Sequence, residues 1–166
     1  MKEQLKVIKT INYINRHSLC EKYSNKLNTI LVKYKDVQLI SRVKNKKAAL
    51  EKMKIRKFKQ ANEISDYIGY MIITDNINEV YKIKNDIENV LGKGIEEDYI
   101  KNPKFGYKSF HLNYTVENGI PLEIQIKTKR MKFAQDIVHD KIYKNFYLPE
   151  DERNRLSQLA YWILQQ

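Results

Sequence analysis

The sequence predicts a mixed α/β (α+β) fold, in which a single sheet carries helices packed on its faces. Two runs of alternating apolar and polar residues flank the pair Asn118-Gly119, which is a strong signal of a β-hairpin. A continuous apolar run over residues 64–74 is typical of a buried strand. Segments with apolar residues at helical spacing lie before and after these strands. The predicted order is helix, helix, strand, helix, strand, helix, the strands of the hairpin, and two final helices.

Length, charge and cysteine content limit the class of protein. The chain has 166 residues, of which 42% are apolar, so we expect one domain with one core. Its net charge of +11 predicts an anionic partner such as a nucleotide or RNA. The one cysteine, Cys20, excludes an internal disulfide and a cysteine zinc cluster, and a reduced, cytoplasmic setting fits best. With no apolar run of membrane-spanning length, we expect no membrane partner.

The first part of the chain, residues 1–36, is expected to form two helices. In the first, over 3–16, the apolar residues are spaced three apart. These residues are Leu5, Ile8, Ile11 and Ile14. A strand over 37–43 would follow, then a short helix that contains Ala49 and Met53. The central part, residues 37–144, is expected to hold the sheet and the catalytic core.

The remaining helices follow from helical spacing and from glycine and proline stop signals. An amphipathic helix over 78–91 would end at Gly92, and a short strand is expected over 95–100. Two helices, over 131–144 and 150–165, are separated by Pro149. The last helix has an apolar stripe that we expect to face the core. This stripe consists of Leu156, Leu159, Trp162 and Ile163.

The polar face of the predicted hairpin is unusual because it gathers reactive side chains. Alternation turns Phe110, Leu112 and their neighbours to one face, and turns the polar residues to the other. The polar set consists of Ser109, His111, Asn113, Glu123, Gln125 and Lys127. The loop before it carries Lys101, Lys104, Tyr107 and Lys108, which have the chemistry to hold a nucleotide.

A basic tract covers residues 44–59. Taken alone, a run of Lys and Arg is more often a solvated surface than a binding site. This tract follows a strand and enters a helix, and a helix N-terminus adds its own partial positive charge. Its position therefore favours a role in binding phosphates.

Two carboxylates, Asp66 and Glu123, are candidates for a metal site. Asp66 lies near the start of a buried apolar run, where a carboxylate is costly unless it is paired, capped or metal-bound. An aspartate in a turn at the edge of a strand is the alternative interpretation. If the two carboxylates meet among Lys and Arg, Mg2+ is the natural ligand, because it prefers one or two carboxylates with phosphate oxygens. Phosphoryl transfer needs little more than such a metal, cations and positioning.

These residues resemble a known family. In order along the chain, the segments RVKNKKAALEKM, ISDYIGYMI, EDYIKNPKFGYKSFH, LEIQIKT and HDKIYK are similar to the synthetase domain of the RelA/SpoT alarmone enzymes. The likeness is strongest to the small stand-alone synthetases and covers residues 37–144. It implies a nucleotidyltransferase-like fold and the transfer of the β,γ-pyrophosphate of ATP to a 3′-hydroxyl. The usual acceptor is GDP or GTP, which gives (p)ppGpp, and one toxin branch modifies the 3′ end of tRNA.

The resemblance implies roles for individual residues. Asp66 and Glu123 match the acidic residues that hold Mg2+, and Glu123 also activates the acceptor hydroxyl. The residues that match ATP-phosphate positions are Arg42, Lys44, Lys52 and Arg56. Tyr107 matches an aromatic that stacks on the acceptor base, although a core aromatic is its alternative interpretation. The other residues implied for the acceptor site are Lys104, Ser109, His111 and Gln125.

Several positions depart from the family pattern. Met71 stands where the family has an arginine that contacts the ATP adenine, and Ala48 replaces a serine of the basic loop. Glu97 stands in place of a lysine, and Ala134 in place of a tryptophan. The loop before Tyr107 is one residue shorter, with Phe105 at a position that is usually small and polar.

Three functions remain open from the sequence. The first is synthesis of (p)ppGpp from ATP and GDP or GTP. The second is the same transfer to tRNA by a toxin, which would imply an antitoxin protein as a partner. The third is an RNA-binding module with a decayed active site, which suits the twelve Tyr and the net charge of +11. Because the tetrameric synthetases carry a longer C-terminal helical tail, we expect a monomer or a weak dimer.

Overall fold

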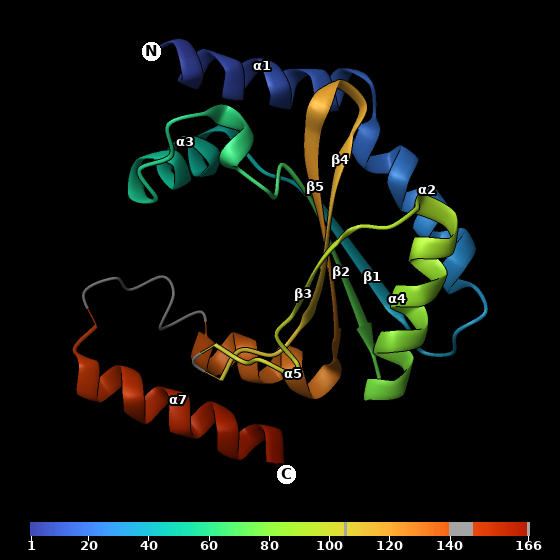
Figure 1. Cartoon of the computed structure of the whole chain (residues 1–166), viewed down its shortest axis with the longest axis vertical. Coiled ribbons are helices and arrows are strands. Elements are labelled where there is room, and N and C mark those ends of the chain that lie inside the picture. The colour runs from blue at the N-terminus through green and yellow to red at the C-terminus, as the bar shows by residue number, and fades with distance from the viewer. Residues whose placement is uncertain (105, 140–147, 166) are drawn as a thin grey trace.

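The computed structural model describes residues 1–104, 106–139 and 148–165. In these ranges a five-stranded sheet, in the order β1-β2-β5-β4-β3, is combined with helices (Figure 1). The strands are β1 (Gln38–Val43), β2 (Ile68–Thr74), β3 (Ile95–Asp98), β4 (Phe110–Val116) and β5 (Ile120–Thr128). The α-helices are α1 (Lys2–Arg16), α2 (Leu19–Leu31), α3 (Lys46–Ile55), α4 (Ile77–Leu91), α5 (Lys129–Ala134) and α7 (Glu150–Gln165). Short helical turns are η1 (Ala61–Glu63), η2 (Glu117–Gly119) and the π-helical η3 (Gln135–His139).

The sheet is mixed, as the sequence predicts. Strand β2 pairs in parallel with β5, and the pairs β1–β2, β4–β5 and β3–β4 are antiparallel. The β4–β5 hairpin turns at Asn118 and Gly119, whose φ angles of 56° and 69° lie in the left-handed region that these residue types tolerate. The predicted hairpin is therefore confirmed at its predicted position.

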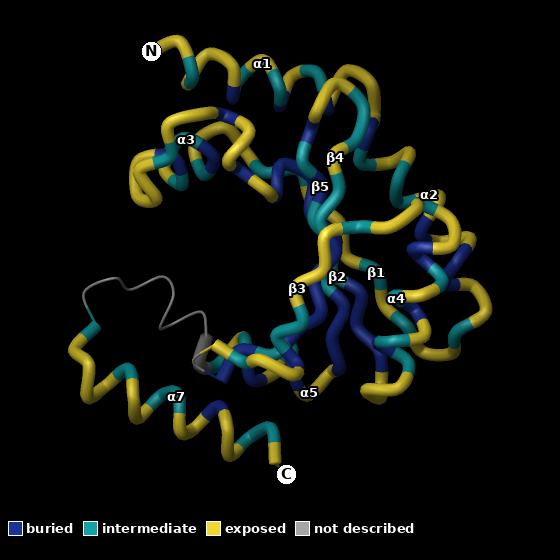
Figure 2. Tube along the Cα trace, viewed as in Figure 1, coloured by how far each residue is buried: buried dark blue, intermediate teal, exposed yellow. Residues whose placement is uncertain are grey.

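One face of the sheet forms the core with α1, α2 and α4. The buried residues gather on β2 and β5, with α2 and α4 on one side of the sheet and α3 and α7 on the other (Figures 1 and 2). Alternation sends Tyr70, Ile72, Leu122 and Ile124 into this core. Their neighbours along β2 and β5 consequently line the opposite face, where the candidate site lies.

The helix stripe predicted for residues 3–16 is wrong in part. Val7 is fully buried with Ile11 and Ile14, whereas Leu5 is 52% exposed. A spacing of three falls 60° short of a full turn at each step, because each residue of a helix turns by 100°. After three such steps Leu5 lies opposite Ile14, so the stripe follows positions 7, 11 and 14.

The second strand begins later than predicted. Strand β2 starts at Ile68, because η1 and the turn after it occupy residues 61–67. The hydroxyl of Tyr67 donates to Ala61 O over 2.9 Å, and Lys44 N donates to Tyr67 O over 2.9 Å. Asp66 therefore lies in a turn before β2 rather than within the strand.

The C-terminal region differs from prediction in two respects. The helix predicted over 131–144 is α5 followed by the π-helical η3, and residues 140–144 lie outside the described residues. In α7, Leu156 and Ile163 pack around buried Ala160, but Leu159 and Trp162 are 40% and 58% exposed. This helix contacts the molecule along one narrow face only, so half of the predicted stripe faces outward.

Helix α7 also contacts the loop that precedes β4. Gly106 has a φ of +76°, and a Cβ atom there would lie 2.5 Å from the Cβ of Ala160. This position therefore requires glycine for both its backbone angle and its close packing. No helix in the described part of the chain is long and apolar enough to cross a membrane.

Candidate functional site

Three strands bring Arg42, Gly69 and Glu123 into one row across the open face of the sheet. Gly69 pairs with Arg42 on β1 and with Glu123 on β5. A Cβ atom on Gly69 would lie 3.4 Å from Nε of Arg42, so the arginine side chain lies over the glycine.

Asp66 lies at the centre of a cluster of three cations. Its Oδ1 is 2.7 Å from Nζ of Lys52, and its Oδ2 is 2.7 Å from Nζ of Lys44 and 3.2 Å from a terminal nitrogen of Arg42. Asp66 is only 5% exposed. Burial raises the pKa of the carboxyl, but the charges and hydrogen bonds of Lys52 and Lys44 outweigh burial and leave that pKa below its usual range.

The start of α3 arranges these cations. The side chain of Asn45 caps the helix by accepting from Ala48 N over 2.8 Å, so α3 begins directly after β1. Lys44 therefore reaches Asp66 from the end of β1, and Lys52 reaches it from within the helix. Arg56, one turn beyond Lys52, is exposed at the C-cap of α3.

Glu123 is held on the open face by two polar neighbours. Nε2 of Gln125 donates to Oε2 over 2.8 Å, and Nδ1 of His111 lies 3.4 Å from Oε1. Burial raises the pKa of Glu123 and His111 lowers it, with a net result below the usual range. The charge of Asp66 also raises this pKa, so the two carboxylates lie close enough to interact.

A pocket of about 470 Å³ opens beside Glu123. Its walls come from β1, β2, β5 and the segment from α5 to η3. The lining includes Arg42, Gly69, Met71, Glu123, Gln125 and Lys132. Met71, the residue that departs from the family arginine, therefore lies in the same pocket as Arg42.

The residues predicted for the acceptor lie together but are largely covered. Tyr107 is 8% exposed, and its Oη lies 2.8 Å from Nε2 of His111. The hydroxyl of fully buried Ser109 donates to Ile126 O over 3.3 Å. Nζ of Lys104 lies 4.9 Å from the ring centroid of Tyr99. Stacking of an acceptor base on Tyr107 stays a prediction, and it requires this group of side chains to open.

The sequence places Lys127 on the polar face of the hairpin, but it gives this residue no role in the site and does not predict its burial. It is fully buried, and its Nζ donates to Tyr107 Oη over 3.2 Å and to Gln125 Oε1 over 2.9 Å. Alternation along β5 places it on the same face as Glu123 and Gln125. Alternation along the strand was therefore a signal for its place beside Glu123. It was not a signal for burial, because a lysine at the end of a strand usually reaches solvent.

The donor set fits Mg2+ only together with a phosphate ligand. The described residues contain no group of three or more His, Cys, Asp or Glu that could hold a metal ion. Asp66 and Glu123 supply two carboxylates, which matches the preference of Mg2+ for one or two carboxylates completed by phosphate oxygens and water. Lys44, Lys52 and Arg42 supply the charge that such phosphates need.

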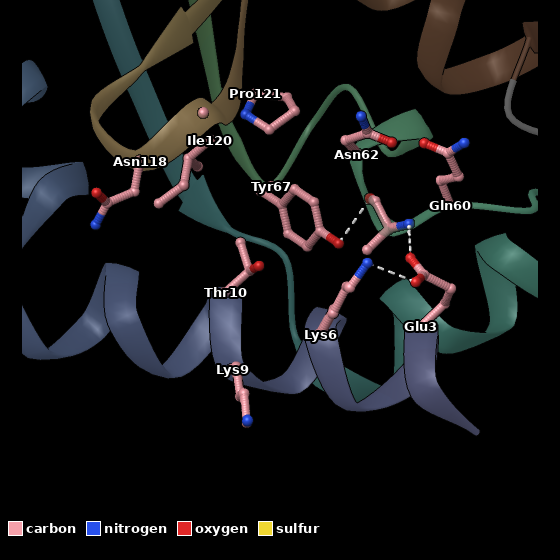
Figure 3. Close-up of a pocket in the computed structure, with 12 residues that line it drawn as sticks. Glu3, Lys6, Lys9, Thr10, Gln60, Asn62, Tyr67, Asn118, Ile120 and Pro121 are labelled. Carbon is pink, nitrogen blue, oxygen red and sulfur yellow. Dashed lines mark hydrogen bonds and ion pairs between the residues drawn. The ribbon is translucent and has the colours of Figure 1, made fainter.

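A second cavity, of about 430 Å³, lies among α1, η1 and the β4–β5 turn (Figure 3). Three of its polar side chains make contacts there: Glu3 accepts from Ala61 N and pairs with Lys6, and Tyr67 donates to Ala61 O. These contacts join the N-terminal helix to the sheet, so this cavity is a structural junction rather than the candidate site.

Comparisons of the sequence with known proteins find relatives that act on guanosine nucleotides by name. The family model described as "Region found in RelA / SpoT proteins" matches residues 41–147. Over 73 residues the chain is 40% identical to a probable GTP diphosphokinase, RSH3, from Arabidopsis thaliana, and this match covers 42% of the chain and 10% of that protein. Over 137 residues it is 27% identical to a guanosine-3′,5′-bis(diphosphate) 3′-pyrophosphohydrolase from Haemophilus influenzae, with 78% and 20% covered. The chain thus spans a small part of these curated relatives.

Solved structures resemble nearly the whole chain. Small alarmone synthetase 1 from Bacillus subtilis, bound to its product pppGpp, superposes with a TM-score of 0.72 and 25% identity over 90% of this chain and 87% of that one. A GTP pyrophosphokinase family protein from Streptococcus pneumoniae gives a TM-score of 0.64 and 25% identity over 96% and 84%. The predicted nucleotidyltransferase-like fold is confirmed by these neighbours.

Proposed function

This chain belongs to the RelA/SpoT family, and from that premise we propose that it is an ATP-dependent pyrophosphokinase. It transfers the β,γ-pyrophosphate of ATP to the 3′-hydroxyl of GDP or GTP and so makes (p)ppGpp. One observation carries the proposal most directly. A nearly buried carboxylate, Asp66, is surrounded by Arg42, Lys44 and Lys52, and its charge raises the pKa of Glu123, which lines a pocket together with Arg42. Cations and carboxylates in this arrangement are what phosphoryl transfer requires.

The proposed reaction exchanges one phosphorus–oxygen bond for another. The 3′-oxygen of the acceptor forms a bond to the β-phosphorus of ATP, the bond from that phosphorus to the α,β-bridging oxygen breaks, and AMP leaves. Glu123 accepts the proton of the attacking hydroxyl, and its lowered pKa keeps it ionised for this role. The three cations around Asp66 release this carboxylate and bind the triphosphate instead. There Arg42, Lys44 and Lys52 stabilise the negative charge that develops in the transition state.

Asp66 and Glu123 are the residues that would hold Mg2+. When bound, the ion would neutralise negative charge on the phosphate oxygens. Arg56, one helical turn from Lys52, is placed by this proposal at the outer end of the triphosphate. The soft side chain of Met71 would lie against the adenine, where the family uses an arginine.

The relatives favour a guanosine nucleotide as the acceptor, because one is named a probable GTP diphosphokinase and one structural neighbour is bound to its product pppGpp. We assign Tyr107, His111, Lys104, Ser109 and Gln125 to this acceptor site. Transfer to tRNA, with an antitoxin partner, is the alternative outcome of the test. The expectation of a monomer or weak dimer is tested by sedimentation.

The deciding experiment uses ATP labelled at the γ-phosphate. The protein is incubated with Mg2+, this ATP, and either GDP, GTP or deacylated tRNA, and AMP release is followed in parallel. Label in a guanosine product supports the proposal. Label in tRNA alone assigns the toxin function, and the absence of transfer to every acceptor supports the RNA-binding module.

A further inference from the structure

A hydrogen-bond network links buried Lys127 to Glu123. Nζ of Lys127 donates to Oε1 of Gln125 over 2.9 Å, to Oη of Tyr107 over 3.2 Å, and to Oε1 of Gln135. It also lies 4.9 Å from the ring centroid of Tyr107. Gln125 in turn contacts Glu123 directly, and Tyr107 contacts His111, which lies beside Glu123. Both branches therefore start at one ammonium group.

The first branch runs through Gln125. An ammonium group has three donors and no acceptor, so the neighbour that binds it must present an oxygen. For Gln125 that oxygen is Oε1, which leaves the amide Nε2 to face Glu123 and donate to its Oε2 over 2.8 Å. Without the ammonium, only the Glu123 carboxylate, which accepts hydrogen bonds, would favour this orientation of the carboxamide.

The second branch runs through Tyr107 and His111. Because Tyr107 Oη accepts from Lys127, its own proton is available to Nε2 of His111, 2.8 Å away. Its alternative acceptor, Oε1 of Gln125, lies farther away at 3.3 Å and already accepts from Lys127. A neutral imidazole that accepts at Nε2 carries its proton on Nδ1, and Nδ1 faces Oε1 of Glu123 at 3.4 Å.

We propose that Lys127 is a positioning residue that sets the direction of both polar contacts to Glu123, so that this carboxylate receives a donor at each oxygen. Glu123 is then held in one orientation as an acceptor, with its remaining lone pairs directed at the open pocket. Lys127 itself does not touch substrate. This inference rests on the proposed role of Glu123 as the base, but the network has a readout that does not depend on turnover.

The first measurement is the tautomer of His111. Protein labelled with 15N-histidine is examined by two-bond proton–nitrogen correlation at a pH of about 8, where a free imidazole is neutral. The resonance of His111 is assigned by its loss in His111→Gln. We expect the Nδ1–H tautomer in the wild type and in Lys127→Arg, which keeps a group with donors only. We expect a mixture in Lys127→Met, which keeps an unbranched side chain one atom shorter and removes the charge.

The second measurement is kinetic. Lys127→Met should lower kcat by roughly 10- to 100-fold, as is usual when a residue that orients a reactive group is removed, and the KM for ATP should be nearly unchanged. Lys127→Arg should recover part of that loss. The matched control is Lys129→Met, at an exposed lysine two positions away that pairs with Asp75 on the surface. It should leave kcat at the wild-type value.

Tyr107→Phe supplies an independent variant. It keeps the ring and removes only the hydroxyl, so it should cut the histidine branch and give the mixed tautomer while the Gln125 branch stays intact. If Lys127→Met fails to fold, this variant decides the result. A wild-type protein with Nε2–H, an unchanged tautomer in Lys127→Met or Tyr107→Phe, or an unchanged kcat in folded Lys127→Met overturns the proposal. If the protein shows the expected tautomers but transfers pyrophosphate to no acceptor, the proposed function is overturned and the hydrogen-bond network is supported.

Discussion

Lys52 reaches from α3 to Asp66, with its Nζ 2.7 Å from Oδ1. With Lys44 at the same distance from Oδ2, both oxygens of the carboxylate are engaged before any nucleotide is bound. Under the proposed function, phosphates that enter this site would draw these lysines away from Asp66 and so free its oxygens for a metal ion.

The first prediction concerns Asp66→Asn. The change keeps the shape of the side chain and removes its charge, so transfer should fall by about a hundredfold or more. The rate of AMP release at saturating ATP and Mg2+ measures the loss, and circular dichroism checks the fold. Asp75→Asn, at an exposed aspartate paired with Lys129, is the matched control and should retain full activity. Activity close to wild type in Asp66→Asn would move the chemistry elsewhere.

Glu123→Gln should separate chemistry from ATP binding. An amide in place of the carboxylate cannot accept the hydroxyl proton, so kcat should again fall by about a hundredfold or more. Binding of a non-hydrolysable ATP analogue, measured by calorimetry without metal, should change little because the cations cluster around Asp66. A large loss of analogue binding would show that Glu123 contributes to the donor site instead.

Tyr107→Ala should weaken use of the acceptor more than binding of ATP. Loss of one stacking platform costs about 1–3 kcal/mol, so we expect a KM increase of roughly 5- to 150-fold for the acceptor alone. Initial rates over a matrix of both substrate concentrations give the two KM values. Equal increases in both would assign Tyr107 a structural role, consistent with its burial against His111.

Stability at acid pH should depend on Glu88. Burial raises the pKa of this carboxyl, but hydrogen bonds from Lys84 and Lys93, each at 2.8 Å, outweigh burial and lower the pKa from 4.5 to about 2. Because the folded pKa is depressed, the stabilisation is present above pH about 4.5 and is lost as the pH falls toward about 2. Urea denaturation across this range should show a smaller pH dependence in Glu88→Gln. The same dependence in both proteins would contradict the prediction, and Glu21→Gln, on an exposed face of α2, is the control.

Salt dependence should distinguish the acceptors. A polyanion that contacts several lysines releases one counterion for each neutralised phosphate, so its binding falls steeply with salt concentration. A single guanosine nucleotide should show a much shallower slope. We expect labelled guanosine product to persist across the salt series. Labelling of tRNA that collapses with salt, without a guanosine product, would contradict this expectation.

Local signals explain which parts of the fold could be predicted. The hairpin was predictable because Asn118 and Gly119 specify the turn, and alternation specifies the two faces. The start of β2 was not, because the apolar residues Ile64 and Tyr67 continue the pattern of the strand through a turn that η1 imposes. In α7, spacing identified a stripe but could not show that only Leu156 and Ile163 of it would find a surface to pack against.

The grouping of polar side chains on one face of the sheet was predictable, but the hydrogen-bond network among them was not. Alternation placed Glu123, Gln125 and His111 on one face, and pairing of β2 with β5 brings Gly69 beside them. Nothing in the sequence reports that Lys127 is buried, because that depends on Gln135 and on the loop packed against α7. The burial of Tyr107 likewise depends on tertiary packing.

The parallel pairing of β2 with β5 also governs when the site can form during synthesis. Strand β2 is complete at Thr74. Its parallel partner β5 begins only at Ile120, after α4, β3, β4 and η2 have been synthesised. The chain must close this long loop before Asp66 and Glu123 can approach each other, and non-local contacts of this kind form slowly. A nascent or truncated chain that ends before Ile120 would therefore carry the Asp66 cation cluster without Glu123, and we expect no consumption of ATP by such a chain.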